Sequence, residues 1–195
     1  MIYEIKALKD INADTSKELF CDTETIGLYG QVRLLQIYQE GWDKVALIEW
    51  PNIYEMIAFL NKFTTVWHNV HYDNTTCQQQ SGTRFVPNSY EDTFFASRLA
   101  QPQFDTYSLD DVMARVLGYD PYTHAGLDKK TLQKSNWDKP KLTEDQLLYA
   151  AIDVYYLPHV WEATKHVIDE ISYKLDKLTV QYRHARDRFS HSVRS

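Results

Sequence analysis

The first part of the chain consists of short apolar runs separated by turn-forming residues, a pattern typical of strands joined by tight turns. Helical spacing appears after Pro51, where apolar residues recur at intervals of three and four. Proline also suits the first turn of a helix. The predicted strands are 20–24, 32–38, 44–48 and 64–67, and the predicted helix carries Ile53, Met56, Ile57 and Leu60.

From about residue 90 onward the apolar spacing becomes helical. Ser108 and Gly118 stand where the N-cap and the C-terminal stop of one helix belong. Thr143 and Gln146 form the capping-box pattern of a second, longer helix. Pro158 lies inside this second pattern. We expect it to kink or break the helix one or two residues earlier, because proline lacks an amide N–H and its ring clashes with the preceding turn.

Composition indicates one ordinary globular domain. The chain has 195 residues, of which 44% are hydrophobic and 25% charged, and one domain typically takes about 150 residues. Two cysteines are too few for a disulfide framework or a four-cysteine zinc site. We find no apolar run of about 18 residues and no signal-peptide core. The expectation is a soluble protein, cytoplasmic or otherwise intracellular, with no membrane partner.

The formal net charge of −6 argues against a simple basic nucleic-acid coat. The charge is uneven, however. Residues 128–141 hold five lysines against two aspartates, and residues 174–195 hold six basic residues against two aspartates. Each segment is either a cationic surface for a phosphate backbone or a plain solvated stretch.

Five residues on three predicted elements have the chemistry of a metal site. Asp22 and Glu24 are two apart on a strand and so share a face. Tyr149 and Asp153 are four apart on a helix and share a side, and Asp73 comes from a third element. Taken singly, each pattern also fits exposed acids or a core tyrosine beside a surface aspartate. Together, these hard oxygen ligands favour two Mg²⁺ or Mn²⁺ ions and phosphoryl hydrolysis in which the tyrosine orients the attacking water.

These motifs resemble the DEDDy 3′–5′ exonucleases of the ribonuclease H-like fold. That group includes ribonuclease D and the proofreading domain of family A DNA polymerases. The resemblance covers about residues 17–165, and Leu148 occupies the position where a sister group carries histidine, which favours the tyrosine version. The matching segments are 22–28 with 32–37, 68–73, 91–99, 127–142 and 149–157.

The resemblance implies a fold, a reaction and a set of site residues. The fold is α/β, a ribonuclease H-like mixed β-sheet flanked by α-helices. The reaction releases nucleoside 5′-monophosphates from a 3′ end. The residues that would bind two divalent ions are Asp22, Glu24, Asp73 and Asp153, and Tyr149 would position the water.

Five further residues are expected to contact the nucleic acid. Leu28 and Asn69 match positions that contact or wedge the terminal nucleotides in the polymerase branch, although Leu28 also suits a core position. Lys129 and Lys130 belong to the lysine-rich segment that would guide the backbone. Trp137 is expected either to stack on a base or to pack.

For the substrate, three hypotheses stand. The leading one is a single-strand 3′–5′ exodeoxyribonuclease, with proofreading for a separately encoded DNA polymerase as a further expectation. A ribonuclease D-like exoribonuclease is the alternative, favoured by the stretch 137–142. A non-catalytic module that binds nucleic acid or a polymerase is the third. The expected division of the chain is an exonuclease domain over 1–175 and a basic helix end and tail over 176–195.

Overall fold

The computed structural model describes residues 2–82, 89–165, 175, 177 and 178. Its central feature is a six-stranded sheet with the order β1-β4-β3-β2-β5-β6. The β2–β3 and β3–β4 pairs are antiparallel, while β1–β4, β2–β5 and β5–β6 are parallel. The strands are β1 (Tyr3–Ile5), β2 (Leu19–Thr25), β3 (Val32–Tyr38), β4 (Val45–Glu49), β5 (Thr64–Trp67) and β6 (Ser89–Asp92).

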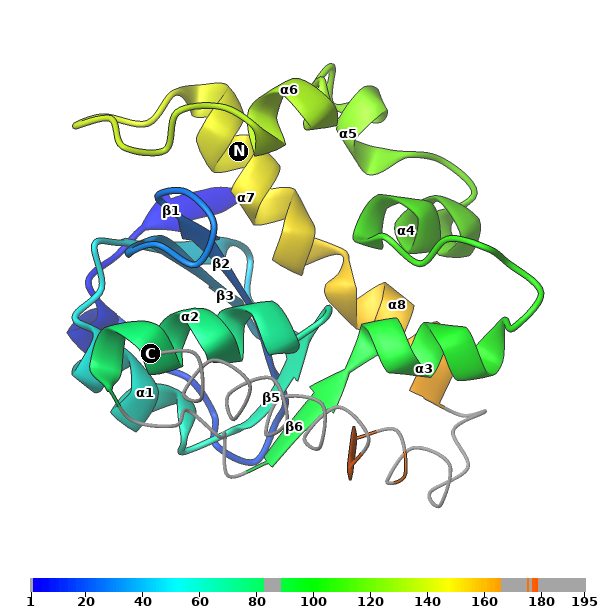
Figure 1. Ribbon diagram of the computed structural model, residues 1–195, viewed down its shortest axis with the longest axis horizontal. Helices are drawn as coiled ribbons and strands as arrows, with labels where there is room; N and C mark the ends of the chain where they lie inside the picture. The colour runs from blue at the N-terminus through cyan, green and yellow to red at the C-terminus, as the bar shows by residue number, and fades with distance from the viewer. Residues whose placement is uncertain (1, 83–88, 166–174, 176, 179–195) are drawn as a thin grey trace, which may run out of the picture.

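Helices cover both faces of this mixed sheet, which confirms the expected ribonuclease H-like α/β class (Figure 1). A short 3₁₀ helix lies at Leu8–Asp10. The α-helices are α1 (Ile53–Leu60), α2 (His71–Ser81), α3 (Thr93–Ala100), α4 (Leu109–Leu117), α5 (Pro121–His124), α6 (Lys129–Gln133), α7 (Glu144–Tyr155) and α8 (Leu157–Lys165).

The long helix α7 crosses one face of the sheet and packs on β1 to β4 (Figure 1). Its predicted capping box is present, with the Thr143 side chain accepting from the Gln146 amide and the Gln146 side chain accepting from the Thr143 amide. The helix ends at Tyr155, and α8 begins at Leu157, so the predicted break before Pro158 is confirmed. One side of this helix is buried in the first of two hydrophobic clusters, to which it contributes Leu147, Ala150, Ala151 and Val154.

The opposite face of the sheet is covered by α1 and α2 through the second hydrophobic cluster. Side chains along β2 alternate between the two clusters. Phe20 belongs to the cluster with α7, whereas Leu19 and Cys21 belong to the cluster with α1 and α2. Residues 22 and 24 therefore point to the α7 face, because side chains one apart on a strand point to opposite faces.

The other predicted elements agree with the structure, with two refinements. Ser108 is the N-cap of α4 and Gly118, with φ 78°, its C-cap, but the Ser108 hydroxyl donates to Asp111 instead of capping a backbone amide. The short edge strands β1 and β6 were not predicted; each has only three or four residues, too few to show an alternating pattern.

No helix in the described part of the chain has the length and apolar character needed to cross a bilayer. The basic segment 174–195 and the expected domain boundary after residue 175 lie outside the described residues, apart from three positions. Those positions are Leu175, Lys177 and Leu178.

Candidate active site

Two carboxylates project from β2 toward α7. Asp22 pairs across the ladder with Gln36 and Glu24 with Leu34, and a bulge follows between Glu24 and Thr25. Both carboxylates are half-buried. The bulge ends the regular pairing just beyond the two acids, which is where the strand gives way to the loop 26–31.

Helix α7 brings the third carboxylate to the same place. Asp153 is buried, with 4% of its surface exposed. One ligand atom from each of Asp22, Glu24 and Asp153 lies within 4.8 Å of the other two. The structure thus joins the strand motif and the helix motif, separated by about 130 residues in the sequence, into one acidic cluster.

The fourth predicted carboxylate, Asp73, lies beside this cluster and outside the 4.8 Å group. It is in the first turn of α2. Its Oδ1 accepts a hydrogen bond of 2.6 Å from Thr23 Oγ1. Asp73 lines the same cavity as Asp22 and Glu24, so it faces the same site from the other side of β2.

The electrostatics of the carboxylates indicate a site built for a cation. Burial, together with the charges of Asp73 and Asp153, raises the pKa of the Asp22 carboxyl well above its usual value. Burial and the same two neighbours likewise raise the pKa of Glu24, whereas the positive charge of Lys129 lowers it. Burial raises the pKa of Asp153 to about 6 and that of Asp73 to about 7. A divalent cation stabilises the ionised form of such clustered carboxylates, because it offsets their mutual repulsion. A set of oxygen ligands alone fits Mg²⁺ or Mn²⁺.

Tyr149 lies one helical turn before Asp153 and is 4% exposed. Its ring is 5.6 Å from that of Tyr122 and 6.1 Å from that of Trp137, measured between centroids. Burial, followed by the charges of Asp153 and Glu24, raises the pKa of the Tyr149 hydroxyl far above its usual value. The hydroxyl therefore stays protonated and can donate a hydrogen bond.

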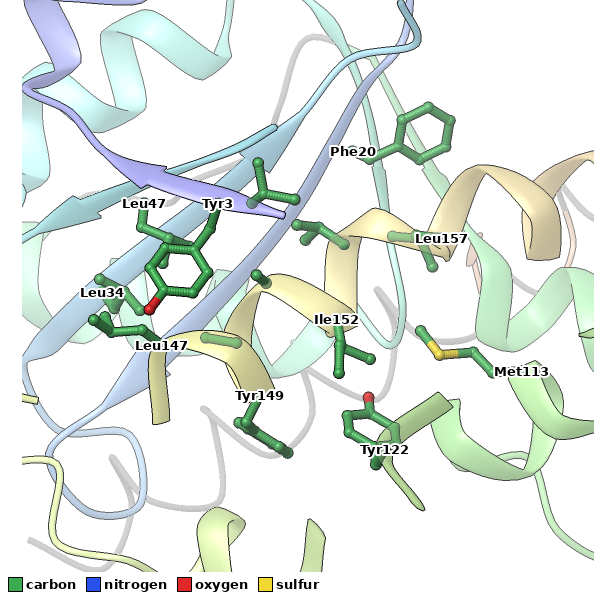
Figure 2. Close-up of a cluster of buried hydrophobic side chains, with 14 of the residues drawn as sticks. Tyr3, Phe20, Leu34, Leu47, Met113, Tyr122, Leu147, Tyr149, Ile152 and Leu157 are labelled. Carbon is green, nitrogen blue, oxygen red and sulfur yellow. The ribbon is translucent and has the colours of Figure 1, made fainter. Parts of the chain in front are cut away.

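Tyr122 is a site residue that the sequence reasoning missed. It is fully buried on the four-residue helix α5, and its hydroxyl donates a hydrogen bond to Asp153 Oδ1. Figure 2 shows its ring beside Tyr149, with the hydroxyl directed toward α7. The sequence contains a helix-start signal here, because Asp120 caps the turn and Pro121 opens it, but nothing that links this turn to Asp153.

The cluster opens into two adjoining cavities. The Leu28 cavity, of about 550 Å³, is lined by Asp22, Glu24, Asp73 and Tyr149 together with Leu28. The Lys129 cavity, of about 380 Å³, is lined by Asp22, Tyr149 and Asp153 together with Lys129 and Ser108. His68, Asn69 and Gln133 border both.

Leu28 is 78% exposed at the edge of the Leu28 cavity, so the alternative that Leu28 occupies a core position is wrong. The loop that carries it is held at both ends. Thr25 Oγ1 donates to the Gly27 carbonyl and pairs with the Tyr72 hydroxyl at 2.6 Å. Gln80 Nε2 donates to the Gly30 carbonyl at 2.7 Å.

Asn69 has a left-handed backbone, with φ 66°. The buried carboxylate of Asp92 accepts from the backbone amides of Asn69 at 2.9 Å and Val70 at 3.1 Å. Asp92 also caps α3 by accepting from the Phe94 amide. One buried side chain thus fixes the turn that presents Asn69 to both cavities.

Lys129 and Lys130 line the Lys129 cavity, whereas Trp137 lines the Leu28 cavity. Lys129 Nζ forms an ion pair of 2.7 Å with Asp110 and lies 4.9 Å from the centroid of the Tyr122 ring. Lys130 is exposed and lines the Lys129 cavity. Trp137 lines the Leu28 cavity but is only 5% exposed, and its ring packs on Tyr149. Of the two roles expected for Trp137, burial supports packing.

Both ring nitrogens of His68 have hydrogen-bond partners. Its Nδ1 hydrogen-bonds to Thr93 Oγ1 at 2.8 Å and its Nε2 to the Tyr107 carbonyl at 2.9 Å. Burial lowers its pKa to about 4, so the ring is neutral near pH 7. His68 therefore ties the two cavities to the start of α4 without adding charge.

The chain is similar in sequence to known 3′–5′ exonuclease domains. The family model described as 3′–5′ exonuclease (DNA_pol_A_exo1) matches residues 1–169. DNA polymerase I of Aquifex aeolicus is 29% identical over 167 residues, which cover 85% of this chain and 26% of that protein. The chain thus spans about a quarter of the length of this curated relative.

Solved structures with the same fold include NrnC and RNase D. Brucella melitensis NrnC bound to pGG is 22% identical with a TM-score of 0.67, covering 90% of this chain and 85% of its own. NrnC is also known with bound Mg²⁺, at 21% identity, a TM-score of 0.67, and coverage of 90% and 86%. Escherichia coli RNase D, an exoribonuclease involved in structured RNA processing, is 21% identical with a TM-score of 0.70, covering 94% of this chain and 51% of its own.

Proposed function

This chain belongs to the 3′–5′ exonuclease family, and from that premise we propose that it hydrolyses single-stranded DNA from the 3′ end in a divalent-metal-dependent reaction that releases nucleoside 5′-monophosphates. The observation that carries the proposal is the meeting of Asp22, Glu24 and Asp153 within 4.8 Å, where the Leu28 cavity and the Lys129 cavity adjoin. Tyr149 lines both cavities.

The metal ligands in this proposal are Asp22, Glu24 and Asp153 from the cluster, and Asp73 from the opposite side of β2. We propose that these four carboxylates together bind two ions. Divalent cations at such a site supply Lewis acidity, which lowers the pKa of water and offsets charge on a phosphoryl group in the transition state. Thr23 holds the Asp73 carboxylate in place through its 2.6 Å hydrogen bond.

Tyr149 acts as a neutral hydrogen-bond donor and orients the attacking water. Its raised pKa keeps the proton on the hydroxyl, which excludes a general-base role for Tyr149 near neutral pH. The aromatic packing on Tyr122 and Trp137 limits the rotation of the ring. This arrangement gives the hydroxyl one direction, which is what a positioning group requires.

The rims of the two cavities hold the strand. Leu28 provides an exposed apolar contact for a terminal base, and Asn69 provides polar groups at the border of both cavities. Lys129 and Lys130 supply positive charge for the phosphates. Trp137 contributes by packing against Tyr149.

DNA is favoured over RNA by two observations. The curated relative is a DNA polymerase I, at 29% identity. The exposed Leu28 and the position of Asn69 agree with the polymerase-branch features of the sequence. We extend the proposal to proofreading in association with a DNA polymerase. RNA trimming is the second candidate, favoured by the similarity of the stretch 137–142 to ribonuclease D.

The test compares matched single-stranded DNA and RNA oligonucleotides, labelled at the 5′ end, with Mg²⁺ or with EDTA. We expect a ladder that shortens from the 3′ end in Mg²⁺, faster for DNA, and no products in EDTA. Faster turnover of RNA would replace the leading candidate with the second one. Shortening that persists in EDTA would contradict the metal dependence.

Asp153→Asn and Asp22→Asn test the site itself. Each removes a ligand charge, and we expect losses of activity of at least about 10²-fold. Asp145→Asn is the matched control, because Asp145 is exposed on the same helix as Asp153. Full activity in the first two variants would contradict the site. A wild-type protein that binds the oligonucleotide without cleaving it would favour the non-catalytic hypothesis.

A further inference from the structure

A groove lined by aromatic rings and arginine lies next to the active site, on α3 and the loop that leads into α4. Its cavity volume is about 500 Å³, within the range of small-ligand pockets. The residues that line it are Phe94, Arg98, Pro102, Phe104, Asp105 and Tyr107. We call it the Phe104 groove. None of the site residues predicted from the sequence lies in it.

The chemistry of the Phe104 groove suits flat, electron-rich rings that carry phosphate. Phe104 is 41% exposed, and the Arg115 guanidinium lies 4.2 Å from the centroid of its ring. Arg98 is exposed, with its guanidinium 5.7 Å from the centroid of the Phe94 ring. Exposed aromatic rings stack on bases of any sequence, while nearby guanidinium groups attract the backbone.

The groove is held in shape by contacts within the loop. The Tyr107 hydroxyl donates to the Gln101 carbonyl at 2.6 Å. Arg115 donates to the Thr106 carbonyl at 2.8 Å, which fixes its guanidinium beside the rings of Phe104 and Tyr107. A stacking surface that is already ordered loses little conformational entropy on binding.

His68 lies between the groove and the active site and contacts residues of the groove. The His68 ring borders both catalytic cavities, contacts the Phe94 ring edge-on at 5.9 Å, and bonds to the Tyr107 carbonyl at 2.9 Å. The next residue, Ser108, lines the Lys129 cavity together with Asp153. A strand that leaves the Lys129 cavity past Ser108 therefore meets Phe94 and Tyr107 next.

We propose that the Phe104 groove binds the bases of the single strand upstream of the two 3′-terminal nucleotides. This inference rests on the proposed exonuclease function, because it names where the rest of that substrate lies. The occupant is single-stranded nucleic acid, since the groove lies across His68 from the catalytic cavities and combines aromatic rings with the guanidinium groups of Arg98 and Arg115. A dinucleotide occupies only the catalytic cavities and makes no contact with the groove.

The experiment compares kcat/KM for a 5′-radiolabelled dinucleotide and an octanucleotide, in the sugar class that the wild-type protein degrades faster. The variants are Phe104→Leu, which keeps an apolar side chain but removes the stacking ring, and Arg98→Ala, which removes an exposed cation. Tyr54→Ala is the control, because Tyr54 is an exposed aromatic residue on α1 that lines neither the catalytic cavities nor the groove.

We expect Phe104→Leu to lower kcat/KM for the octanucleotide about 10-fold, the effect of losing one stacked base, with dinucleotide turnover unchanged. Arg98→Ala should act in the same direction and make the octanucleotide rate less dependent on salt. Equal losses on both lengths, or no loss on either, would overturn the proposal.

A second measurement separates this proposal from the function on which it rests. The equilibrium affinity for the octanucleotide in EDTA, where no turnover is expected, is measured by filter binding for wild type, Phe104→Leu and Tyr54→Ala. Weaker binding in Phe104→Leu alone supports the groove even if the wild type cleaves nothing, a result that would contradict only the exonuclease activity. Equal affinity in all three proteins would overturn the groove and leave the exonuclease proposal intact.

Discussion

The hydroxyl of Tyr122 donates a hydrogen bond to the carboxylate of Asp153, although the two residues lie 31 positions apart and on different helices. This contact joins the four-residue helix α5 to the central helix α7. The ring of Tyr122 also lies beside that of Tyr149, with 5.6 Å between the ring centroids. The orientation of a proposed metal ligand and of the proposed water-positioning tyrosine therefore depends on one short helix outside the sheet.

Removing the Tyr122 hydroxyl should weaken catalysis without unfolding the protein. In Tyr122→Phe the ring stays packed, but Asp153 loses a donor, and a hydrogen bond to a charged group contributes about 1.5–3 kcal/mol. We expect kcat to fall about 10-fold and the Mg²⁺ concentration for half-maximal activity to rise. Tyr54→Phe, which loses a surface hydrogen bond to the Ser81 carbonyl, is the control. An unchanged Mg²⁺ dependence would show that the contact does not position the ligand.

Tyr149→Phe should remove most activity, because it deletes the proposed donor to the attacking water. We expect a loss in kcat of about 10²-fold, the lower end for a positioned side chain. The melting temperature should change little, since the ring keeps its contacts with Trp137 and Tyr122. Because the pKa of the hydroxyl is raised, the wild-type rate should show no decline from ionisation of Tyr149 up to pH 9.5. Retention of full activity in the variant would contradict the assigned role.

Without metal, the folded protein should be less stable at pH 8 than at pH 5. Burial raises the pKa of Asp73 from 3.8 to about 7, and those of Asp92 and Asp153 to about 6. The folded chain then binds more protons than the unfolded chain, so the free energy of unfolding falls between about pH 4 and pH 7. The pKa of His68 is lowered to about 4, so this residue alone would make the free energy of unfolding rise between pH 4 and 6.5. The three acids outweigh this single histidine.

Melting temperatures in EDTA at pH 5 and pH 8, repeated with Mg²⁺, measure this effect. Mg²⁺ should raise the melting temperature at pH 8, where the carboxylates are ionised, and much less at pH 5. A metal-free protein that is more stable at pH 8 than at pH 5 would contradict the pKa directions given for these acids.

Leu28→Ala should affect substrate binding and leave stability almost unchanged. The side chain is 78% exposed, so its removal costs within about 0.5 kcal/mol of unfolding free energy. Loss of an apolar contact of roughly 1 kcal/mol with a terminal base should raise KM about five-fold. The buried Leu35→Ala provides the contrast, with an expected loss of about 2–5 kcal/mol in stability. A KM equal to that of the wild type would show that Leu28 does not touch the substrate.

Much of the fold follows from local signals in the sequence. The helix from Thr143 is set by its capping box and ends before Pro158, because both signals act within one turn of the chain. The strands of the first half follow from apolar runs, since β2 and β3 are buried on both faces. The strands β1 and β6 are stabilised by parallel pairing with distant partners, which no local pattern reveals.

The candidate site likewise contains features that the sequence predicts and contacts that it does not predict. The pairs Asp22 with Glu24 and Tyr149 with Asp153 are readable because each pair shares one element and one face. The residues that hydrogen-bond to the site carboxylates cannot be predicted from the sequence in this way. Tyr122 reaches Asp153 through the packing of α5 on α7, and Thr23 reaches Asp73 because β2 lies beside α2. Such contacts depend on tertiary packing, which the spacing of residues along one element does not contain.

Acids and hydroxyls alternate along β2. Asp22 and Glu24 face the cluster on the α7 side, while Thr23 binds Asp73 and Thr25 binds Tyr72 on the α2 side. Inserting or deleting a single residue within this strand would exchange both faces at once, sending hydroxyls to the cluster and carboxylates toward α2. Variation in length should therefore be confined to the loops at either end, while the span from Leu19 to Thr25 keeps a constant number of residues.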